Sequence, residues 1–576
     1  MKHIKCNQRL LFVLCVAALS LPNFILFFTE PAPLIARVCN VVLPVSIWWM
    51  VMTLVKRPGK MFYIVFLFVF FDAFQIVLLD MYGEAILAVD MFLNLMTTNV
   101  YEAGEQLGGI LPAVIFVVVI YVPIMFWSVV SFYHPPLTRR FIYRHRKYAT
   151  FGLIIGALML VSCYFTVQKF SFINDIYPIN VVDNLDIAIR RTVRTNMYSN
   201  TSKHFSFDAT PTHSASERET YILVIGETAR ADNFGVYGYE RNTTPRLAAN
   251  ERLCVYRDAL TQANVTHKSV PMILTSVSAE NFDSIYVQKS IITAFNEAGF
   301  RTAFFSNQRP NRSFIDFFGE EAQNCVFVKA QMKADANVSD DVLLGHLRSE
   351  LADTTVLKRF VVLHTYGSHF NYCDRYPESD RHFTPERITT IGYRHRDVMV
   401  NAYDNSILYT DRLLSNVIEL ADSVGGSACV MYLSDHGEDI YDDNRRRYMH
   451  ASPVPSYYQL RVPFMLWTST EYGEAHPVED KAVRQNVNCP IATNQVVFHT
   501  LLGLSGIHTS YRDDRLSVGS PHFSAPKRYY LNDHNEPQSL DAIGLKRQDL
   551  EMFQKNGRRY PSPRIISHRF FAVCVW

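Results

Sequence analysis

Charged residues are scarce in this chain, and neither sign predominates. Asp, Glu, Lys and Arg together make up 19% of the 576 residues, and the formal net charge is +2. Proteins that bind nucleic acids are typically strongly basic, and this chain is not. No nucleic-acid partner is therefore expected. Low-complexity runs are also absent, and aromatic residues reach 13%, which together exclude a disordered chain.

The hydrophobic share of 49% is an average over two unlike parts. Residues 1–167 hold 12 Lys/Arg and 7 Asp/Glu, whereas the remainder holds 44 and 47. The first part is therefore apolar enough for membrane-spanning helices. The remaining ~400 residues are enough for one large domain with a full core. We predict a transmembrane domain over 1–168, a linker over 169–218 and an exported domain over 219–576.

Five apolar runs in the first part each approach the ~20 residues that cross a ~30 Å hydrocarbon core. No small-x-small cleavage site follows the first run, so it is predicted to be an anchor and not a signal peptide. Lys and Arg precede the first run and fill the loops after the second and fourth, which predicts a cytoplasmic N-terminus and an exported domain after Val167. The predicted spans are Leu10–Phe28, Leu34–Val55, Met61–Leu79, Ile110–Phe132 and Thr150–Val167.

The loop Asp80–Gly109 contains no Lys or Arg. Its apolar middle, Ala85–Thr98, indicates an amphipathic helix on the outer membrane face. The residues that follow would then lie at headgroup depth beside the exported domain, although an ordinary polar helix end is the alternative. Asp72 lies inside the third predicted span, where a carboxylate normally faces protein or water.

Short β-rich runs alternate with helical stretches after residue 218, and this alternation favours a mainly parallel sheet covered by helices on both faces. Residues 169–218 read as a tether with one helix around Val182–Arg194. The predicted strands are Tyr221–Ile225, Thr302–Phe305, Phe360–Leu363, Cys429–Leu433 and Phe464–Trp467, and the predicted helices are Lys289–Ala298, Val342–Leu351, Val398–Leu420 and Asn494–Leu504.

Polar residues follow three of these strands. Glu227 comes after the first strand, His369 after Phe360–Leu363, and Asp435 and His436 after Cys429–Leu433. Functional sites in such folds gather at the carboxyl edge of the sheet. A mostly oxygen set with imidazole suits Zn²⁺, with Mn²⁺ as the alternative. Each residue alone is more often a surface side chain, but their joint placement predicts a metal site.

A possible nucleophile lies in the segment 264–271, which reads NVTHKSVP. A hydroxyl at a helix start, near a divalent cation and backbone N–H groups, can lose its proton and attack phosphorus. Thr266 and Ser269 both qualify on chemical grounds. The alternative is an ordinary helix cap, a position that Ser and Thr often fill.

A series of short segments follows in a characteristic order along the chain: 227–233 (ETARADN), 242–245 (NTTP), Thr266 before Pro271, 364–369 (HTYGSH), 403–407 (YDNSI) and 434–438 (SDHGE). Together they resemble the phosphoethanolamine transferases of Gram-negative inner membranes. The resemblance covers nearly the whole chain, including the five predicted spans and the segment Thr98-Asn99…Glu102.

The resemblance implies a fold and a set of residue roles. The fold would be an α-helical membrane domain followed by an α/β/α sandwich of the alkaline-phosphatase and sulfatase type. Thr266 would be the nucleophile. The other implied roles are zinc binding for Glu227, Thr266, Asp435 and His436, phosphate binding and proton transfer for His369 and His450, a polar pocket for Asn307, Gln308 and Arg312, and contact with the lipid headgroup for Asn99 and Glu102.

The implied activity is that of a phosphotransferase of the bacterial inner membrane with a periplasmic catalytic domain. It would move phosphoethanolamine from phosphatidylethanolamine to lipid A or the lipopolysaccharide core, through a covalent phosphothreonine, and release diacylglycerol. The added ammonium would lower the negative surface charge and so weaken the binding of cationic antimicrobial peptides.

The cysteines depart from the family pattern. Lipid A-modifying members often have paired cysteines around the nucleophile, whereas residues 255–324 contain none. The six exported cysteines match no family framework, and Cys429 is predicted to lie in the core. An oxidising compartment permits disulfides among the others, but the sequence does not give their connectivity. Three alternatives stay open: a phosphoglycerol transferase, a sulfatase-like hydrolase of the same fold, and a non-enzymatic receptor that has lost metal ligands.

Overall fold

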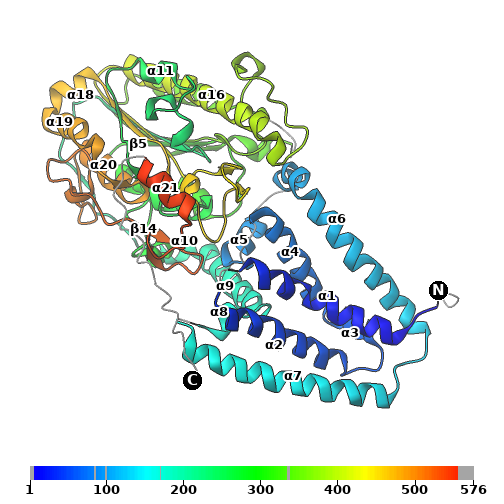
Figure 1. The fold of residues 1–576 in the computed structure, drawn as a ribbon. Helices are drawn as coiled ribbons and strands as arrows, with labels where there is room; N and C mark the ends of the chain where they lie inside the picture. The colour runs from blue at the N-terminus through cyan, green and yellow to red at the C-terminus, as the bar shows by residue number, and fades with distance from the viewer. Residues whose placement is uncertain are drawn as a thin grey trace, which may run out of the picture.

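The computed structural model describes residues 5–30, 32–82, 86–97, 100–168, 170–333 and 338–555. Two parts are visible in Figure 1: a bundle of long helices built from the first third of the chain, and an α/β domain seated on one end of that bundle. The order of the two parts along the chain is the one that the composition predicts.

The helix bundle matches the predicted membrane domain. Four helices in the described residues are long and apolar enough to cross a membrane alone. A bent pair, α3 (Pro58–Ile64) and α4 (Phe66–Tyr82), turns by 71° and raises the number to five if it counts as one span. The predicted five spans correspond to this upper count. The four single helices are α1 (Gln8–Thr29), α2 (Leu34–Met52), α6 (Val100–Val130) and α7 (Arg139–Thr166).

Asp72 on α4 faces protein, as expected for a carboxylate in a membrane helix. Its Oδ1 accepts a 2.7 Å hydrogen bond from the hydroxyl of Tyr177, which lies beyond the last membrane helix. The backbone of Tyr177 is held as well, because its N–H donates to Oδ1 of Asn40 and its carbonyl accepts from Nδ2 of Asn23. This buried polar group therefore fastens the chain that leaves the membrane onto the bundle.

Residues 170–218 contain more helix than the tether predicted there. The helix α9 (Ile179–Asn196) packs against α5 (Val89–Thr97), which occupies the predicted amphipathic stretch. Two shorter helices flank α9, namely α8 (Phe172–Asp175) and α10 (Tyr198–Thr201). Figure 1 shows α5 and α9 at the junction between the bundle and the α/β domain.

The α/β domain is built on a seven-stranded sheet with the order β3-β11-β8-β2-β7-β5-β6. In sheet order, the five strands β8, β2, β7, β5 and β6 are each parallel to the next. Strand β11 runs antiparallel to both of its neighbours, β3 and β8. The sheet is thus mainly parallel, as predicted. The strands are β2 (Glu219–Gly226), β3 (Leu253–Val255), β5 (Arg301–Ser306), β6 (Asn324–Phe327), β7 (Lys358–His364), β8 (Ser427–Ser434) and β11 (Phe464–Thr468).

Helices cover both faces of the sheet, and each face has its own buried apolar cluster. Side chains at alternate positions of β2 divide between the two clusters, because successive strand residues point to opposite faces. The helices on one face are α12 (Thr266–Ile273), α13 (Ile291–Glu297) and α20 (Thr493–Leu504), and those on the other are α15 (Asp341–Leu351) and α16 (Arg396–Ser423).

A buried ion pair joins the two parts of the molecule. Oδ2 of Asp90 on α5 lies 2.6 Å from Nζ of Lys268 on α12, and both side chains are largely buried. His267 contacts the same helix, since its Nδ1 lies 3.0 Å from Oδ1 of Asn94. Burial raises the pKa of Asp90, but Lys268 and His267 outweigh it and lower that pKa to about 2. The polar face of α5 therefore binds the α/β domain.

Replacing Asp90 by Ala should lower the thermal unfolding midpoint of the full-length protein in detergent. The change leaves the ammonium of Lys268 buried without its carboxylate, and breaking a buried pair from one side costs about 3–5 kcal/mol. Asp186→Ala, which removes an exposed ion pair with Arg190, is the control and should change the midpoint little. An unchanged midpoint for Asp90→Ala would contradict the role assigned to the pair.

Candidate active site

Three buried side chains converge at the carboxyl edge of the sheet. Glu227 follows β2, and Asp435 and His436 follow β8, the neighbouring strand. Each offers a ligand atom, and these atoms lie within 4.8 Å of one another. Nε2 of His436 is 3.4 Å from Oε1 of Glu227 and 3.3 Å from Oδ2 of Asp435. The structure therefore brings together three of the predicted metal ligands.

The loop after β7 packs against this group. Gly367 has a φ of +53°, and a Cβ at that position would lie 2.7 Å from the backbone of Glu227. The next residue, Ser368, donates its N–H to the carbonyl of Glu227 at 3.0 Å. A glycine is thus required where the two strand ends meet, and it fixes the backbone from which the Glu227 side chain projects.

The electrostatics of the group favour a bound cation. Burial raises the pKa of Asp435 to about 7 and lowers the pKa of His436 well below its ordinary value. The buried Oδ2 of Asp435 has no hydrogen-bond partner among the described residues. Two carboxylates buried this closely are costly unless a positive charge compensates them. The donor set of two carboxylates and one neutral imidazole fits a divalent metal ion.

Thr266 begins α12 and points its hydroxyl at the same group. Its Oγ1 lies 3.1 and 3.3 Å from the two carboxylate oxygens of Glu227 and 3.1 Å from Nε2 of His436. Ser269, the other possible nucleophile, is fully buried, and its hydroxyl donates to the carbonyl of Asp435 at 2.6 Å. Asn494 also donates to this hydroxyl, so Ser269 is held by the core while Thr266 faces the candidate metal site.

Two further histidines border the site. The ring of His450 lies 4.3 Å from that of His436 and 6.3 Å from that of His369, measured between centroids. Nδ1 of His369 lies 2.7 Å from the carbonyl of Phe370. Burial, with nearby Arg375 and His450, lowers the pKa of His369 to about 3. His369 is therefore neutral, and its Nδ1 donates to that carbonyl.

The site opens into a cavity of about 340 Å³ that both parts of the molecule line. Glu227, Thr266, His369 and His450 line it from the α/β domain. Helices α4, α5 and α6 close its other side with Phe74, Val77, Leu78, Met81, Tyr82, Met91, Asn94, Leu95 and Ile110. A polar wall thus faces a largely apolar wall, and the apolar wall comes from the membrane part.

The predicted polar pocket is only partly assembled around the site. Gln308 lies there, since its Nε2 donates to Oε2 of Glu227 at 3.0 Å. Asn307 is buried and donates to Asp340, which also accepts from the backbone of Gly367. Asn307 therefore stabilises the loop after β7. Arg312 lines an adjoining cavity of about 210 Å³. Asn99 lies outside the described residues, and so does the side chain of Glu102, whose backbone is in the first turn of α6.

Several residues that border the cavity were not predicted. His267 and Asn94 line it, and so does Arg309, which follows Gln308. The hydroxyl of Tyr82 on α4 donates to the carbonyl of His450 at 2.8 Å, which ties a membrane helix to the site. His267 and Arg309 could have been predicted, because each directly follows a predicted site residue, Thr266 or Gln308. The sequence around Tyr82 contains no feature that predicts its contact with the site.

The nine cysteines in the described part of the chain are all free. Cys429 is completely buried in β8, where the sequence placed it in the core. Among the described residues no disulfide therefore contributes to the domain around the site.

Comparison with protein families finds a match to the sulfatase family over residues 219–507, which is half of the chain. The Kdo(2)-lipid A phosphoethanolamine 7''-transferase of Escherichia coli K12 is 31% identical over 299 residues, covering 50% of this chain and 51% of that protein. EptA of Escherichia coli O157:H7 is 29% identical over 298 residues, covering 50% and 54%. The matched region thus spans about half the length of these curated relatives.

Solved structures extend the comparison to the fold. The periplasmic domain of EptC from Escherichia coli, crystallised with zinc, is 25% identical with a TM-score of 0.53, covering 58% of this chain and 96% of that one. The integral membrane EptA of Neisseria meningitidis is 20% identical with a TM-score of 0.71, covering 89% and 98%. The predicted fold, a helical membrane part followed by an alkaline-phosphatase-like α/β domain, is confirmed. The chain belongs to the sulfatase family, and phosphoethanolamine transferases are among the relatives that it resembles over this region.

Proposed function

We propose that the protein transfers phosphoethanolamine from phosphatidylethanolamine to lipid A or the lipopolysaccharide core through a covalent phosphothreonine at Thr266. One observation carries this proposal. The hydroxyl of Thr266 contacts the candidate metal ligands Glu227 and His436 at the floor of a cavity whose opposite wall is made of membrane helices. A nucleophile so placed meets the headgroup of a lipid whose acyl chains stay in the membrane.

Glu227, Asp435, His436 and Thr266 would hold a Zn²⁺ ion. The geometry of the first three and the unpartnered Oδ2 of Asp435 support this assignment, and the related EptC domain was crystallised with zinc. When bound, the ion would lower the pKa of the threonine hydroxyl and offset negative charge on the phosphoryl oxygens. Mn²⁺ is the alternative ion, because it accepts the same carboxylate and imidazole ligands.

The residues of this chain supply the attack and the proton transfers. Oγ1 of Thr266 forms a bond to phosphorus, the bond from phosphorus to the glycerol oxygen breaks, and diacylglycerol leaves with one proton. Because Nδ1 of His369 is bonded to a backbone carbonyl, Nε2 is the nitrogen that exchanges protons. It can then accept the proton of the acceptor group that attacks the phosphothreonine. His450, beside His436, would contact the phosphoryl group.

The membrane part would position both substrates. Donor and acceptor would be lipids of the periplasmic leaflet, with the N-terminus cytoplasmic and the catalytic domain periplasmic. The apolar wall from α4 and α5 fits the first carbons of the donor acyl chains, and Gln308 fits the phosphate side of the headgroup. Each transfer adds an ammonium to an anionic glycolipid and so weakens the attraction of cationic antimicrobial peptides.

The alternative functions are less well supported. A sulfatase-like hydrolase would be expected to have a Cys or Ser nucleophile, whereas the hydroxyl that contacts Glu227 and His436 belongs to Thr266. A phosphoglycerol transferase would share the metal site and differ in the headgroup it accepts. A receptor with a degenerate domain would have lost ligands, yet all four predicted metal-binding side chains are present and adjoin one another.

Glu227→Ala and Asp435→Ala should each reduce the zinc bound per chain by about one ion. Each change removes one of the two carboxylates that would neutralise the cation. Elemental analysis of the purified full-length protein, with Asp186→Ala as an exposed-carboxylate control, measures the loss. Wild-type zinc content in both variants would remove these residues from the ligand set.

Thr266→Ala should fold and insert but transfer nothing. Wild-type protein incubated with phosphatidylethanolamine and no acceptor should gain the mass of a phosphoethanolamine group on the peptide that contains Thr266, detected by mass spectrometry. Ser269→Ala, which removes a buried hydroxyl, should still acquire that mass. An adduct on Ser269 in the wild type would refute the assignment of the nucleophile.

Glu102→Ala should slow transfer from phosphatidylethanolamine in bilayers by at least an order of magnitude while leaving the zinc content unchanged. A carboxylate at headgroup depth would pair with the ethanolamine ammonium, and loss of such orientation has large effects on rate. Slow hydrolysis of a small soluble phosphodiester should hardly change. Equal bilayer activity of Glu102→Ala and wild type would contradict a headgroup role for this residue.

A further inference from the structure

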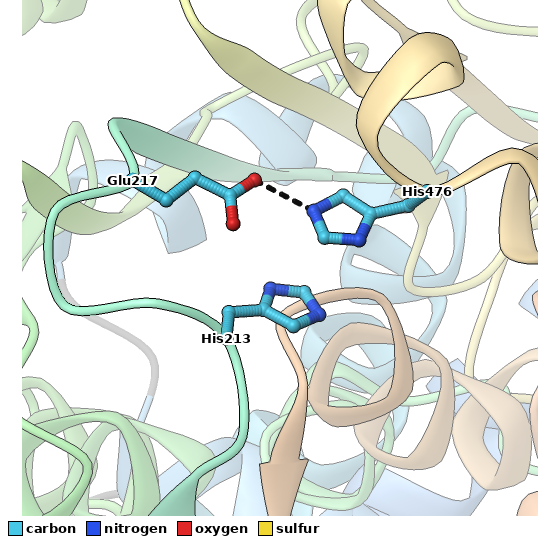
Figure 2. Close-up of side chains that lie close together, drawn as sticks. All are labelled: His213, Glu217 and His476. Carbon is cyan, nitrogen blue, oxygen red and sulfur yellow. Dashed lines mark hydrogen bonds and ion pairs between the residues drawn. The ribbon is translucent and has the colours of Figure 1, made fainter.

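A second group of metal-binding side chains lies at the opposite end of β2 from Glu227. His213, Glu217 and His476 each offer a ligand atom, and these atoms lie within 4.8 Å of one another. Figure 2 shows the three side chains pointing toward a common centre, two from the segment before β2 and one from a distant part of the chain. The eight residues of β2 span ~25 Å, so this group is separate from the candidate active site.

The three side chains are close and half-buried. Nε2 of His476 lies 2.7 Å from Oε1 of Glu217, and 12% and 22% of these side chains are exposed. The imidazoles of His213 and His476 stack with centroids 4.0 Å apart and planes 16° from parallel. Two imidazoles held face to face beside a carboxylate form a compact set of nitrogen and oxygen donors.

A buried carboxylate orients one of the histidines. Oε2 of Glu219, which is completely buried, lies 3.0 Å from Nδ1 of His213. Hydrogen bonds from Lys358 and Tyr221 hold the same carboxylate. Nδ1 of His213 faces this acceptor. Nε2 is then the nitrogen available to a metal, the arrangement common among metal-binding histidines.

The backbone around the group is fixed before any ion binds. His476 lies between α18 (Thr470–Ala475) and α19 (Pro477–Gln485), and its N–H donates to the carbonyl of Tyr472 at 2.8 Å. Gly506 approaches His213 so closely that a Cβ there would lie 2.3 Å from Cδ2 of the ring. Its φ of +59° also favours glycine. Both histidines are thus held in place by neighbouring backbone.

We propose that His213, Glu217 and His476 bind a Zn²⁺ ion that fastens the segment before β2 to the α/β domain. Two imidazole nitrogens and one carboxylate oxygen provide three of the four positions of a tetrahedral zinc site, and water can complete it. The segment joins the membrane helices to the first strand of the sheet.

The proposal does not depend on the reaction, and its test begins from a variant without the active-site ligands. Full-length Glu227→Ala/Asp435→Ala protein in detergent is stripped with a chelator, supplied with Zn²⁺ and analysed for metal content. About one zinc per chain should remain. Adding His213→Ala and His476→Ala should remove it, whereas the matched control His508→Ala, an exposed histidine on the nearby β13 (Ile507–His508), should not.

Two results would overturn the proposal. The first is a starting variant that binds no zinc, as expected if the three side chains are only hydrogen-bonded to one another. The second is a variant that keeps its zinc after both histidines are replaced. A milder change keeps the test decisive if those variants fail to fold. Glu219→Gln should weaken zinc binding at this site roughly 10- to 100-fold, because it removes the carboxylate that contacts Nδ1 of His213. Competition with a chelating dye measures the zinc affinity. Unchanged zinc affinity of Glu219→Gln would also count against the proposal.

Discussion

The parallel register of three neighbouring strands is the constraint on which the candidate active site depends. Ile225 of β2 pairs with His364 of β7 on one side and with Leu433 of β8 on the other, so the three strands end at one level. Glu227, Asp435 and the loop that bears His369 leave the sheet at that level. A shift of one residue would move a ligand by ~3.3 Å and turn it to the other face. The sheet therefore sets the spacing of the candidate metal ligands, and the apolar clusters on its two faces stabilise the sheet.

The contact between the two parts of the molecule gives this site its membrane setting. Helix α5 turns Asp90 and Asn94 toward α12, the helix that begins with Thr266. Tyr82 of α4 bonds the carbonyl of His450 from the same side. The helix that begins with Thr266 and one of the histidines at the candidate site are thus each bonded directly to the membrane part. Under the proposed function, the helices that contact the donor lipid also fix the residues that act on it.

Much of this organisation could be predicted from the sequence because it follows from local patterns. The apolar runs of the membrane part and the alternation of short strands with helices are local, and so are the polar residues directly after strands. Glu227, Asp435 and His436 were found in this way, and the structure brings them together. Chemistry alone left Thr266 and Ser269 open as candidate nucleophiles, and the family resemblance favoured Thr266. The fold adds a physical reason, because the tertiary structure buries Ser269 against Asn494.

The contacts that escaped prediction join residues far apart in the chain. Nothing near Asp90 or Lys268 indicates that these charges pair, because 178 positions separate them. The same holds for Glu217 and His476, which are 259 positions apart. The 71° turn between α3 and α4 depends likewise on how the helices pack. Ion pairs of this kind are specified by topology, and the sequence records them only as isolated polar residues.

Under the proposed function, a phosphoethanolamine group, and nothing else of the donor, passes to a glycolipid. The most direct measurement uses phosphatidylethanolamine that carries one isotope in the ethanolamine and another in the glycerol, mixed in bilayers with the full-length protein and a lipid A acceptor bearing core sugars. The ethanolamine label should appear on the acceptor in an amount equal to that of the glycerol label in diacylglycerol. Release of free phosphoethanolamine into water at the rate of donor loss would contradict it, as would arrival of the glycerol label on the acceptor.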